Sequence, residues 1–273
     1  MRHQNYFANA ANNKQYAKNW IDMMLSKYND KINRSIALTT YYNENNMFVS
    51  PFMRVRGLEI DIKETDSVSA VFEETYYAQS WGGSEKVCVL NFASYKNPGG
   101  MFIEGSNAQE ECLCRESTLY PVLKSFEDNY YKNNKNEKNR GLYLNRALYS
   151  PYIVFHRYGT NCTADVLTCA APNFTSAKKY CNVTKEENIA TLESRCEFVL
   201  DIMNANDVKV PILGAFGCGV FGQDAHTVAN IFKTILESKK HHSFNKVVFA
   251  VIPGPNAEAF KEVFNGIVGN REV

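Results

Sequence analysis

The chain has 273 residues, of which 45% are hydrophobic and 22% are charged, the profile of a soluble globular protein with a substantial core. Its formal net charge of +1 gives no sign of a nucleic-acid or anionic-membrane surface. The sequence has no apolar run of membrane-spanning length, and its first residues contain no apolar signal core. These features predict an intracellular, cytoplasmic protein, and we expect it to be a monomer.

Cysteine and histidine usage gives no indication of a metal site. The chain contains eight cysteines without any Cys-x-x-Cys pair, and several of them fall within apolar runs. This favours buried, reduced thiols over disulfides or zinc ligands. The histidines lack the spacing of metal ligands, so we expect neither a metal nor another cofactor.

The first part of the chain is predicted to be helical and then extended. Residues 1 to about 35 carry aromatic and methionine side chains at helical spacing. Residues 38–62 are rich in β-branched and aromatic side chains and are expected to be extended. A helix capped near residue 66 follows. We expect residues 1–84 to form an extension that packs on a core made of residues 85–273.

Strands alternate with helices in the rest of the chain. The expected strands are 87–92, 164–169, 208–213 and 246–252, and the aromatic stretch 141–158 is expected to supply strands beside a cleft. The expected helices are 106 to about 124, two that begin after caps at Thr184 and Asp224, and 256–264. The polar stretch 129–140 is expected to be an exposed connection. This order predicts an α/β fold with a parallel or mixed sheet covered by helices on both faces.

The stretch that follows the strand at 87–92 carries the first candidate site. Asn97-Pro98-Gly99-Gly100 suits a tight loop and would not be tolerated inside a strand. Ser106 and Gln109 have the spacing of a helix-capping box. Glu110 and Glu111 therefore fall in the first helical turn. A strand, a glycine loop and a helix N-terminus with two adjacent carboxylates form the layout of an active site.

A carboxylate in a first helical turn is common, because it complements the helix dipole. Here, however, the glycine loop and the sheet edge aim Glu110 and Glu111 at a ligand. Consecutive helical residues point about 100° apart, so one carboxylate is expected to orient a substrate and the other to exchange a proton. Desolvation and a bound diphosphate would oppose the dipole and raise the pKa of the acid.

A second glycine-rich loop lies at 214–222 and reads GAFGCGVFG. It follows an expected strand and precedes the helix capped by Asp224, an arrangement that lets backbone N–H groups approach an anion. It lacks the Lys-Ser/Thr pair of a P-loop. The pattern favours a pyrophosphate cradle over a plain turn.

Both segments resemble one known family. The stretch NPGGMFIEGSNAQEE resembles the signature of poly(ADP-ribose) glycohydrolases, a run of glycines followed by Gln-Glu-Glu, and LGAFGCGVFGQD is similar to the diphosphate loop of the microbial form. The segments NFAS, LYSP and APN fit as well. The resemblance covers roughly residues 85–255, and parts of the N-terminal region look similar too. It implies a macrodomain-like mixed central sheet flanked by helices.

The resemblance also implies an activity and a set of site residues. The expected activity is hydrolysis of ribose–ribose O-glycosidic bonds in poly(ADP-ribose) on modified proteins, with release of ADP-ribose and without a metal. Glu111 is expected to protonate the leaving ribose oxygen and then to activate water, while Glu110 holds ribose hydroxyls. The implied contacts to ribose and diphosphate are Asn91, Asn97, Gly99, Gly100, Met101, Gln109, Gly217, Cys218, Gly219, Val220 and Phe221.

One residue departs from the signature, because Met101 stands in the place of its third glycine. If that position requires a positive φ, methionine is strained there by about 1 kcal/mol or more. A methionine would also narrow the pocket and change which linkages fit. Two alternatives therefore stay open: a macrodomain that binds ADP-ribose without cleaving it, and a hydrolase that acts on mono-ADP-ribosylated protein or nucleic acid.

Overall fold

The structure, a computed structural model, describes residues 10–46, 57–80, 85–238 and 244–265. Its strands are β1 (Thr40–Asn43), β2 (Glu59–Lys63), β3 (Val87–Phe92), β4 (Arg146–Arg157), β5 (Thr160–Cys169), β6 (Val210–Leu213) and β7 (Lys246–Ala250). Its α-helices are α1 (Ala10–Leu38), α2 (Ser67–Ser80), α3 (Gln109–Arg115), α4 (Leu119–Lys124), α5 (Lys132–Asn136), α6 (Phe174–Cys181), α7 (Lys185–Ala205), α8 (Ala225–Glu237) and α9 (Pro255–Phe264).

The strands form one seven-stranded sheet in the order β1-β4-β5-β3-β6-β7-β2. β1, β4 and β5 pair antiparallel, whereas β5, β3, β6, β7 and β2 pair parallel. The sheet is therefore mixed, as the sequence predicts. Because the carboxyl ends of parallel strands meet at one edge, the segments that follow β3, β5, β6 and β7 lie together there.

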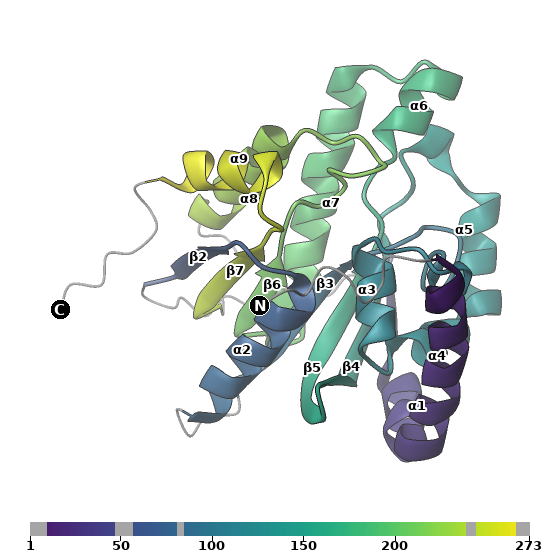
Figure 1. The fold of residues 1–273 in the computed structure, drawn as a ribbon. Coiled ribbons are helices and arrows are strands. Elements are labelled where there is room, and N and C mark those ends of the chain that lie inside the picture. The colour runs from purple at the N-terminus through teal and green to yellow at the C-terminus, as the bar shows by residue number, and fades with distance from the viewer. Residues whose placement is uncertain (1–9, 47–56, 81–84, 239–243, 266–273) are drawn as a thin grey trace.

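Helices cover both faces of the sheet (Figure 1): α7, α8 and α9 lie on one face, and α1 to α4 lie on the other. The side chains of β3 show why, since they alternate between the two faces. Cys88 and Leu90 pack in the core under α7 to α9, and Val87 and Val89 pack in the core on the other face. All four are buried, so β3 is a central strand that is packed on both faces, and this packing fixes the position of the segment that follows it.

The first part of the chain shares the sheet with the rest. β1 and β2 are its two outer strands, β1 paired with β4 and β2 paired with β7. The long helix α1, kinked at Tyr28, packs against β4 and α4. The division between an extension (1–84) and a core (85–273) stays a prediction. The predicted helix before residue 10 and the predicted extended residues 47–56 lie outside the described residues.

Two sequence-based expectations on the helices are wrong. The helix expected from 106 to about 124 is broken into α3 and α4, because Ser117 forms a β-bridge with Phe155 between them. The stretch expected to be an exposed connection contains a π-helical turn (Glu127–Tyr131) and α5, and it buries Tyr130 and Tyr131. Burial of these two rings gives this polar stretch an anchor that its composition does not indicate.

The caps predicted for the later helices are confirmed. The Thr184 hydroxyl accepts a hydrogen bond from the N–H of Glu187, and the Glu187 carboxylate accepts one from the N–H of Thr184, which is a complete capping box. The Asp224 carboxylate accepts from the N–H of Thr227 at the start of α8. Both interactions join residues three positions apart, so the local sequence is enough to specify them.

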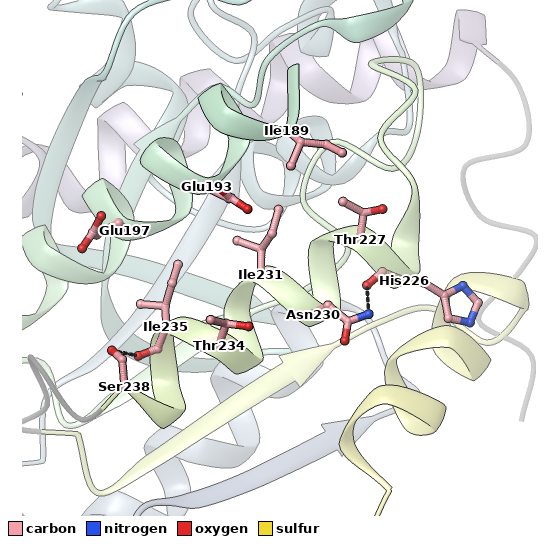
Figure 2. A pocket seen from close by; sticks show the side chains of 10 residues that line it. All are labelled: Ile189, Glu193, Glu197, His226, Thr227, Asn230, Ile231, Thr234, Ile235 and Ser238. Atoms are coloured by element: carbon pink, nitrogen blue, oxygen red, sulfur yellow. Dashed lines mark hydrogen bonds between the residues drawn. The ribbon is translucent and has the colours of Figure 1, made fainter. Parts of the chain in front are cut away.

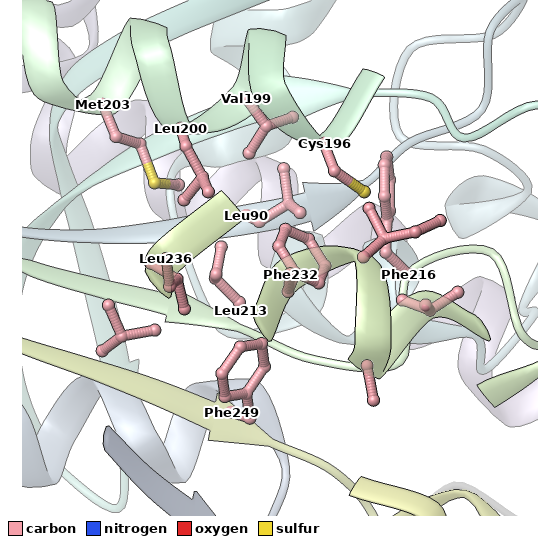
Figure 3. Packing of buried hydrophobic residues seen from close by; sticks show 14 of the residues in the cluster. Leu90, Cys196, Val199, Leu200, Met203, Leu213, Phe216, Phe232, Leu236 and Phe249 are labelled. Atoms are coloured by element: carbon pink, nitrogen blue, oxygen red, sulfur yellow. The ribbon is translucent and has the colours of Figure 1, made fainter. Parts of the chain in front are cut away.

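The aromatic core under α8 and α9 allows a test of packing (Figure 3). Phe249 of β7 is fully buried, and its ring centroid lies 5.6 Å from that of Phe232 and 4.9 Å from that of Phe264. Phe249→Ala should lower the free energy of unfolding by about 3–5 kcal/mol, because it leaves a cavity. Exposed Tyr76 is the control, and Tyr76→Ala should cost about 0.5 kcal/mol or less. Equal losses in urea denaturation would contradict this assignment of the core.

Candidate active site

The first glycine loop follows β3 at the carboxyl edge of the sheet. The N–H of Gly100 donates to the carbonyl of Asn97 at 3.0 Å, and the N–H of Phe102 donates to the carbonyl of Gly99 at 3.0 Å, which closes a tight turn. Gly99 and Gly100 have φ of +67° and +60°, values that favour glycine. The side chain of Asn97 is exposed, so within this turn Asn97 acts through its backbone.

Glycine is needed at position 100 for a second reason, because the two glutamate side chains lie next to it. A Cβ atom on Gly100 would lie 2.4 Å from Oε1 of Glu111 and 3.0 Å from Oε2 of Glu110. The 2.4 Å distance is too short for a real contact with a Cβ atom, and the 3.0 Å distance is tighter than most such contacts. The backbone of the loop is therefore in direct contact with the two carboxylates, and only glycine fits at position 100.

The capping box expected from Ser106 and Gln109 is absent from this segment as the structure describes it. The N-cap of α3 is Ala108, with no side-chain cap. Instead, the carboxamide of Gln109 reaches back to the sheet: Oε1 accepts from the N–H of Phe92 at 2.8 Å, and Nε2 donates to the carbonyl of Leu90 at 2.9 Å. Nε2 also donates to the hydroxyl of Ser67 at 3.0 Å. These bonds fix the start of α3 to β3 and α2, so we assign Gln109 a positioning role.

Glu110 is 3% exposed and its carboxylate is held on both oxygens. Oε2 accepts from the N–H of Ser94 at 2.6 Å, and Oε1 accepts from Nδ2 of Asn91 at 3.2 Å. Asn91 is itself fully buried and also donates to the Thr168 hydroxyl of β5. Burial raises the pKa of Glu110 to about 8, against the opposing effect of these donors. Glu110 is therefore largely protonated at neutral pH.

Glu111 differs from Glu110 because only one of its two carboxylate oxygens accepts a hydrogen bond from a described residue. Its side chain is 5% exposed, and Oε1 accepts from the N–H of Met101 at 2.8 Å. Oε2 is buried, and none of the described residues donates a hydrogen bond to it. A buried carboxylate oxygen without a partner costs free energy, so its retention points to a use in binding or chemistry.

Met101 occupies its position without strain. Its φ is −110°, so the third position of the signature does not require glycine here. Its side chain is 51% exposed, while its N–H holds Glu111. The methionine therefore leaves the glutamate in place and puts an apolar side chain at the mouth of the site.

The second glycine loop follows β6 at the same edge. Gly217 has φ of +79°, and a Cβ atom there would lie 2.7 Å from Cβ of Ala171, the first residue of the APN segment. The N–H groups of Gly219, Val220 and Phe221 make no hydrogen bond with any residue that the structure describes. Val220 is 85% exposed at the tip of the loop. Three successive N–H groups arranged in this way suit an anion such as a diphosphate.

Side chains around the second loop hold its shape. Gln223 donates from Nε2 to the carbonyl of Pro172 at 2.8 Å, and the N–H of Gln223 donates to the carbonyl of Gly217 at 3.1 Å. The ring of Phe221 packs edge-on to that of Tyr143, with centroids 6.0 Å apart. Burial raises the pKa of the Cys218 thiol to about 12, so this side chain adds no negative charge beside the loop.

The sequence did not single out several residues that position the site. Ser94 and Thr168 hold Glu110 and Asn91, and only the NFAS segment gave any signal for Ser94. The N-terminal helix also braces the first loop, since Nδ2 of Asn13 donates to the carbonyl of Gly105 at 2.9 Å. Contacts between α1 and this loop link residues 92 positions apart, which no local pattern reveals.

Two surface pockets lie away from the glutamate pair. One is a groove of about 580 Å³ between α7 and α8, with isoleucines at its base and Glu193 and Glu197 along one side (Figure 2). The other, about 470 Å³, lies among β2, β7 and α2 and contains Lys63 and Lys246. Neither pocket includes Glu110 or Glu111, so the candidate site rests on the hydrogen bonds and close approaches at the two loops and the start of α3, not on these pockets.

No group of three or more His, Cys, Asp or Glu side chains in the described parts of the chain is arranged to hold a metal ion. All eight cysteines have free thiols, four of them buried. None of the described helices is long and apolar enough to cross a membrane.

The raised pKa of Glu110 makes a prediction for stability. Between the ordinary pKa of 4.5 and the value of about 8, the folded protein binds more protons than the unfolded chain. The free energy of unfolding should therefore fall with rising pH in this window, by up to about 1.4 kcal/mol per pH unit, and the loss is complete above pH 8. Glu110→Gln should remove this part of the pH dependence in urea titrations. Parallel profiles for the wild type and the variant would contradict it, and exposed Glu104→Gln is the control.

Comparisons with known proteins agree with this geometry. The family model described as the catalytic domain of microbial-type PARG matches residues 8–158, which include the first glycine loop and the glutamate pair. The match starts well before residue 85 and therefore includes most of the N-terminal region, parts of which look similar to the family from the sequence. No curated protein matches.

Solved structures match over nearly the whole chain. Poly(ADP-ribose) glycohydrolase from Thermomonospora curvata, bound to the inhibitor ADP-HPD, is 27% identical with a TM-score of 0.80, covering 92% of this chain and 99% of that one. The enzyme from Deinococcus radiodurans in complex with ADP-ribose is 26% identical with a TM-score of 0.73, covering 85% of this chain and 96% of that one. Since the family model spans more than half of the chain, this protein belongs to the microbial-type poly(ADP-ribose) glycohydrolases.

Proposed function

We propose that this protein hydrolyses the ribose–ribose O-glycosidic bonds of poly(ADP-ribose) and releases ADP-ribose. The observation that carries the proposal is the buried Oε2 of Glu111, which no described residue satisfies and which lies beside the first glycine loop. Family membership and the ADP-ribose and ADP-HPD bound to the two related structures support the same substrate class.

The two loops divide the substrate between them. The diphosphate lies on the N–H groups of Gly219, Val220 and Phe221, with Gly217 and Cys218 completing the loop. The ribose next to the scissile bond lies against the backbone from Gly99 to Met101. Backbone N–H groups bind phosphate oxygens without the side-chain entropy that lysine or arginine would lose.

We divide the chemistry between the two carboxyl groups. Glu111 donates a proton to the leaving ribose oxygen as the bond from C1 to that oxygen breaks. Its carboxylate then takes a proton from water as the water oxygen bonds to C1, which restores the acid. Glu110, largely protonated at neutral pH, donates a hydrogen bond to a ribose hydroxyl while Asn91 and Ser94 hold its oxygens. We propose this assignment, with Glu111 as the acid and Glu110 as the contact to ribose.

The sequence leaves two other functions open. A non-catalytic reader of ADP-ribose would have been favoured by strain at Met101, but this residue is unstrained and its N–H holds Glu111 in place. A hydrolase of mono-ADP-ribosyl linkages stays an alternative, because Met101 puts an exposed apolar side chain next to Glu111, where the signature has glycine. Monomeric state and location in the cytoplasm stay predictions from the sequence.

The decisive variant is Glu111→Gln, which keeps the shape of the side chain and removes its acidity. It should lower kcat on poly(ADP-ribose) by about 10²–10⁴-fold. The Kd for ADP-ribose should stay within about twofold, because Oε1 keeps its position beside Met101. Release of ADP-ribose and calorimetric binding are measured on the same preparations. Glu104→Gln, an exposed acid in the same segment, should behave as the wild type.

Parallel loss of turnover and ADP-ribose affinity in Glu111→Gln would show that Glu111 is a binding contact and not the acid. Binding of ADP-ribose without cleavage of the polymer by the wild type would favour the reader. Cleavage of mono-ADP-ribosylated protein alone would favour the other linkage.

Gly100→Ala tests the approach of the loop to the glutamates. The new Cβ atom would meet Oε1 of Glu111 at 2.4 Å, so the carboxylate has to move, and kcat/KM should fall by about 10-fold or more. Gly159→Ala is the matched control: Gly159 also has a positive φ, but nothing lies within 4 Å of its Cβ position. Both changes should cost about 1 kcal/mol of stability from backbone strain. Equal activity in the two variants would contradict the proposed geometry.

A further inference from the structure

Helix α6 presents two lysine–aromatic pairs to solvent. Nζ of Lys178 lies 5.9 Å from the ring centroid of Phe174, and Nζ of Lys179 lies 5.0 Å from that of Tyr180. Both lysines are exposed, and the Tyr180 side chain is 72% exposed. An exposed ring beside a cation offers a surface on which a base can stack and a phosphate can be neutralised. Surfaces that bind nucleotide chains without reading a sequence combine aromatic rings for stacking with basic side chains for the phosphates.

Positive charge is concentrated in and around this helix. Residues 174–185 contain three lysines and no acidic residue, and residues 132–140 contain four basic residues and one acidic residue, in a chain whose net charge is only +1. The two segments adjoin: Gly141, the residue after the second segment, accepts a hydrogen bond from the N–H of Asn173 at 3.0 Å, and a Cβ atom on Gly141 would lie 3.2 Å from Cα of Ala177 in α6. Arg140 is paired with Glu187, whereas Lys138 is exposed beside it. The remaining charge favours a polyanionic partner.

The first turn of α6 contacts the second glycine loop directly. The N–H of Thr175 donates to the carbonyl of Phe221 at 3.1 Å, and a Cβ atom on Gly222 would lie 2.3 Å from Oγ1 of Thr175. Residues three and four positions apart lie on the same face of a helix, so Lys178 and Lys179 share the face of Thr175. These two lysines therefore lie on the side of α6 that adjoins the loop.

The sheet order places α6 relative to the glutamate pair. α6 follows β5, which is one neighbour of β3, while the second glycine loop follows β6, the other neighbour of β3. The segment with Glu110 and Glu111 follows β3, between these two. A substrate that occupies the second loop and reaches the glutamates thus has α6 next to its path.

We propose that this surface, made of Lys138, Phe174, Lys178, Lys179 and Tyr180 and here named the α6 surface, binds the ADP-ribose unit next to the one in the active site. The inference rests on the proposed function. The neighbouring unit carries an adenine that stacks on Tyr180 or Phe174 and a diphosphate that the lysines neutralise. Free ADP-ribose has no such second unit, so the α6 surface selects polymer over monomer and holds it for cleavage.

A single-stranded nucleic acid carries the same two chemical features, bases and phosphates. The direct contact between α6 and the second glycine loop favours the polymer that this loop serves. The α7–α8 groove is unsuited to either, because Glu193 and Glu197 line one side of it (Figure 2) and would repel phosphates.

The test measures Kd for poly(ADP-ribose) of defined length and for ADP-ribose, with the full chain carrying Glu111→Gln so that polymer persists. Lys178→Glu combined with Lys179→Glu should weaken polymer binding by about tenfold at low salt. The slope of log Kd against log salt should decrease by about 0.7 for each phosphate that the lysines no longer neutralise. Tyr180→Ala should weaken polymer binding at all salt concentrations, and the Kd for ADP-ribose should stay within about twofold.

Lys27→Glu on α1 is the matched control, since Nζ of Lys27 lies 5.2 Å from the ring centroid of Tyr28 on a different part of the molecule. It should leave polymer affinity unchanged. Unchanged polymer affinity in the α6 variants, or equal weakening for polymer and ADP-ribose, would refute the α6 surface. Tighter binding of polyadenylate than of poly(ADP-ribose), weakened equally in the α6 variants, would assign the surface to nucleic acid instead.

The proposed function is tested separately, by cleavage with Glu111 intact. Polymer binding that depends on α6 in a protein that does not cleave would support the α6 surface and refute the hydrolase. Cleavage of the polymer together with polymer binding that the α6 variants do not change would support the hydrolase and refute the α6 surface.

Discussion

The contact between the first glycine loop and two buried carboxylates is the constraint on which the site depends. A Cβ atom at Gly100 would overlap Oε1 of Glu111, so the N–H of Met101 reaches that oxygen only because glycine precedes it. Buried carboxylates need donors, and here the backbone supplies them at Met101 and Ser94. Backbone donors cannot rotate away as a side chain can, so both acids are held in place relative to the first glycine loop.

Burial of Glu110 and Glu111 lowers the stability of the folded protein, and other interactions have to offset this loss. Glu110 is kept largely protonated by desolvation, and Oε2 of Glu111 has no donor among the described residues. Both features oppose stability, and the well-packed sheet offsets them: β3 is buried on both faces, and Gln109 ties the start of α3 to it. A rigid strand beneath the pair therefore makes this arrangement possible.

The two loops handle charge in different ways from α6. In the proposed complex the second loop binds phosphate with backbone N–H groups, which add no net charge, and the lysines lie outside the loop on α6. This proposed division reconciles a net charge of +1 with a polyanionic substrate. Overall charge averages a basic α6 surface with acidic regions such as the side of the α7–α8 groove, so it conceals the surface that we propose for the polymer.

Local sequence patterns predict much of this fold. Alternating strand and helix patterns predicted the mixed sheet, and the caps at Thr184 and Asp224 were predictable because their partners lie three residues away. The two glycine loops and the position of Glu110 and Glu111 at a helix start were also predicted. Each of these features depends on backbone conformations and neighbours within one turn or one loop.

Tertiary contacts decided the rest. Gln109 has the spacing of a capping residue, yet it bonds to β3 and to Ser67, 42 residues away. The bridge between Ser117 and Phe155 ends α3 where the sequence predicts a continuous helix, and burial of Tyr130 and Tyr131 orders a stretch that looks exposed. The raised pKa of Glu110 likewise comes from desolvation by the surrounding fold. Local sequence determined which groups are present at the site, and only the packing of distant segments decided their partners and their protonation, because burial and long-range hydrogen bonds exist only in the folded chain.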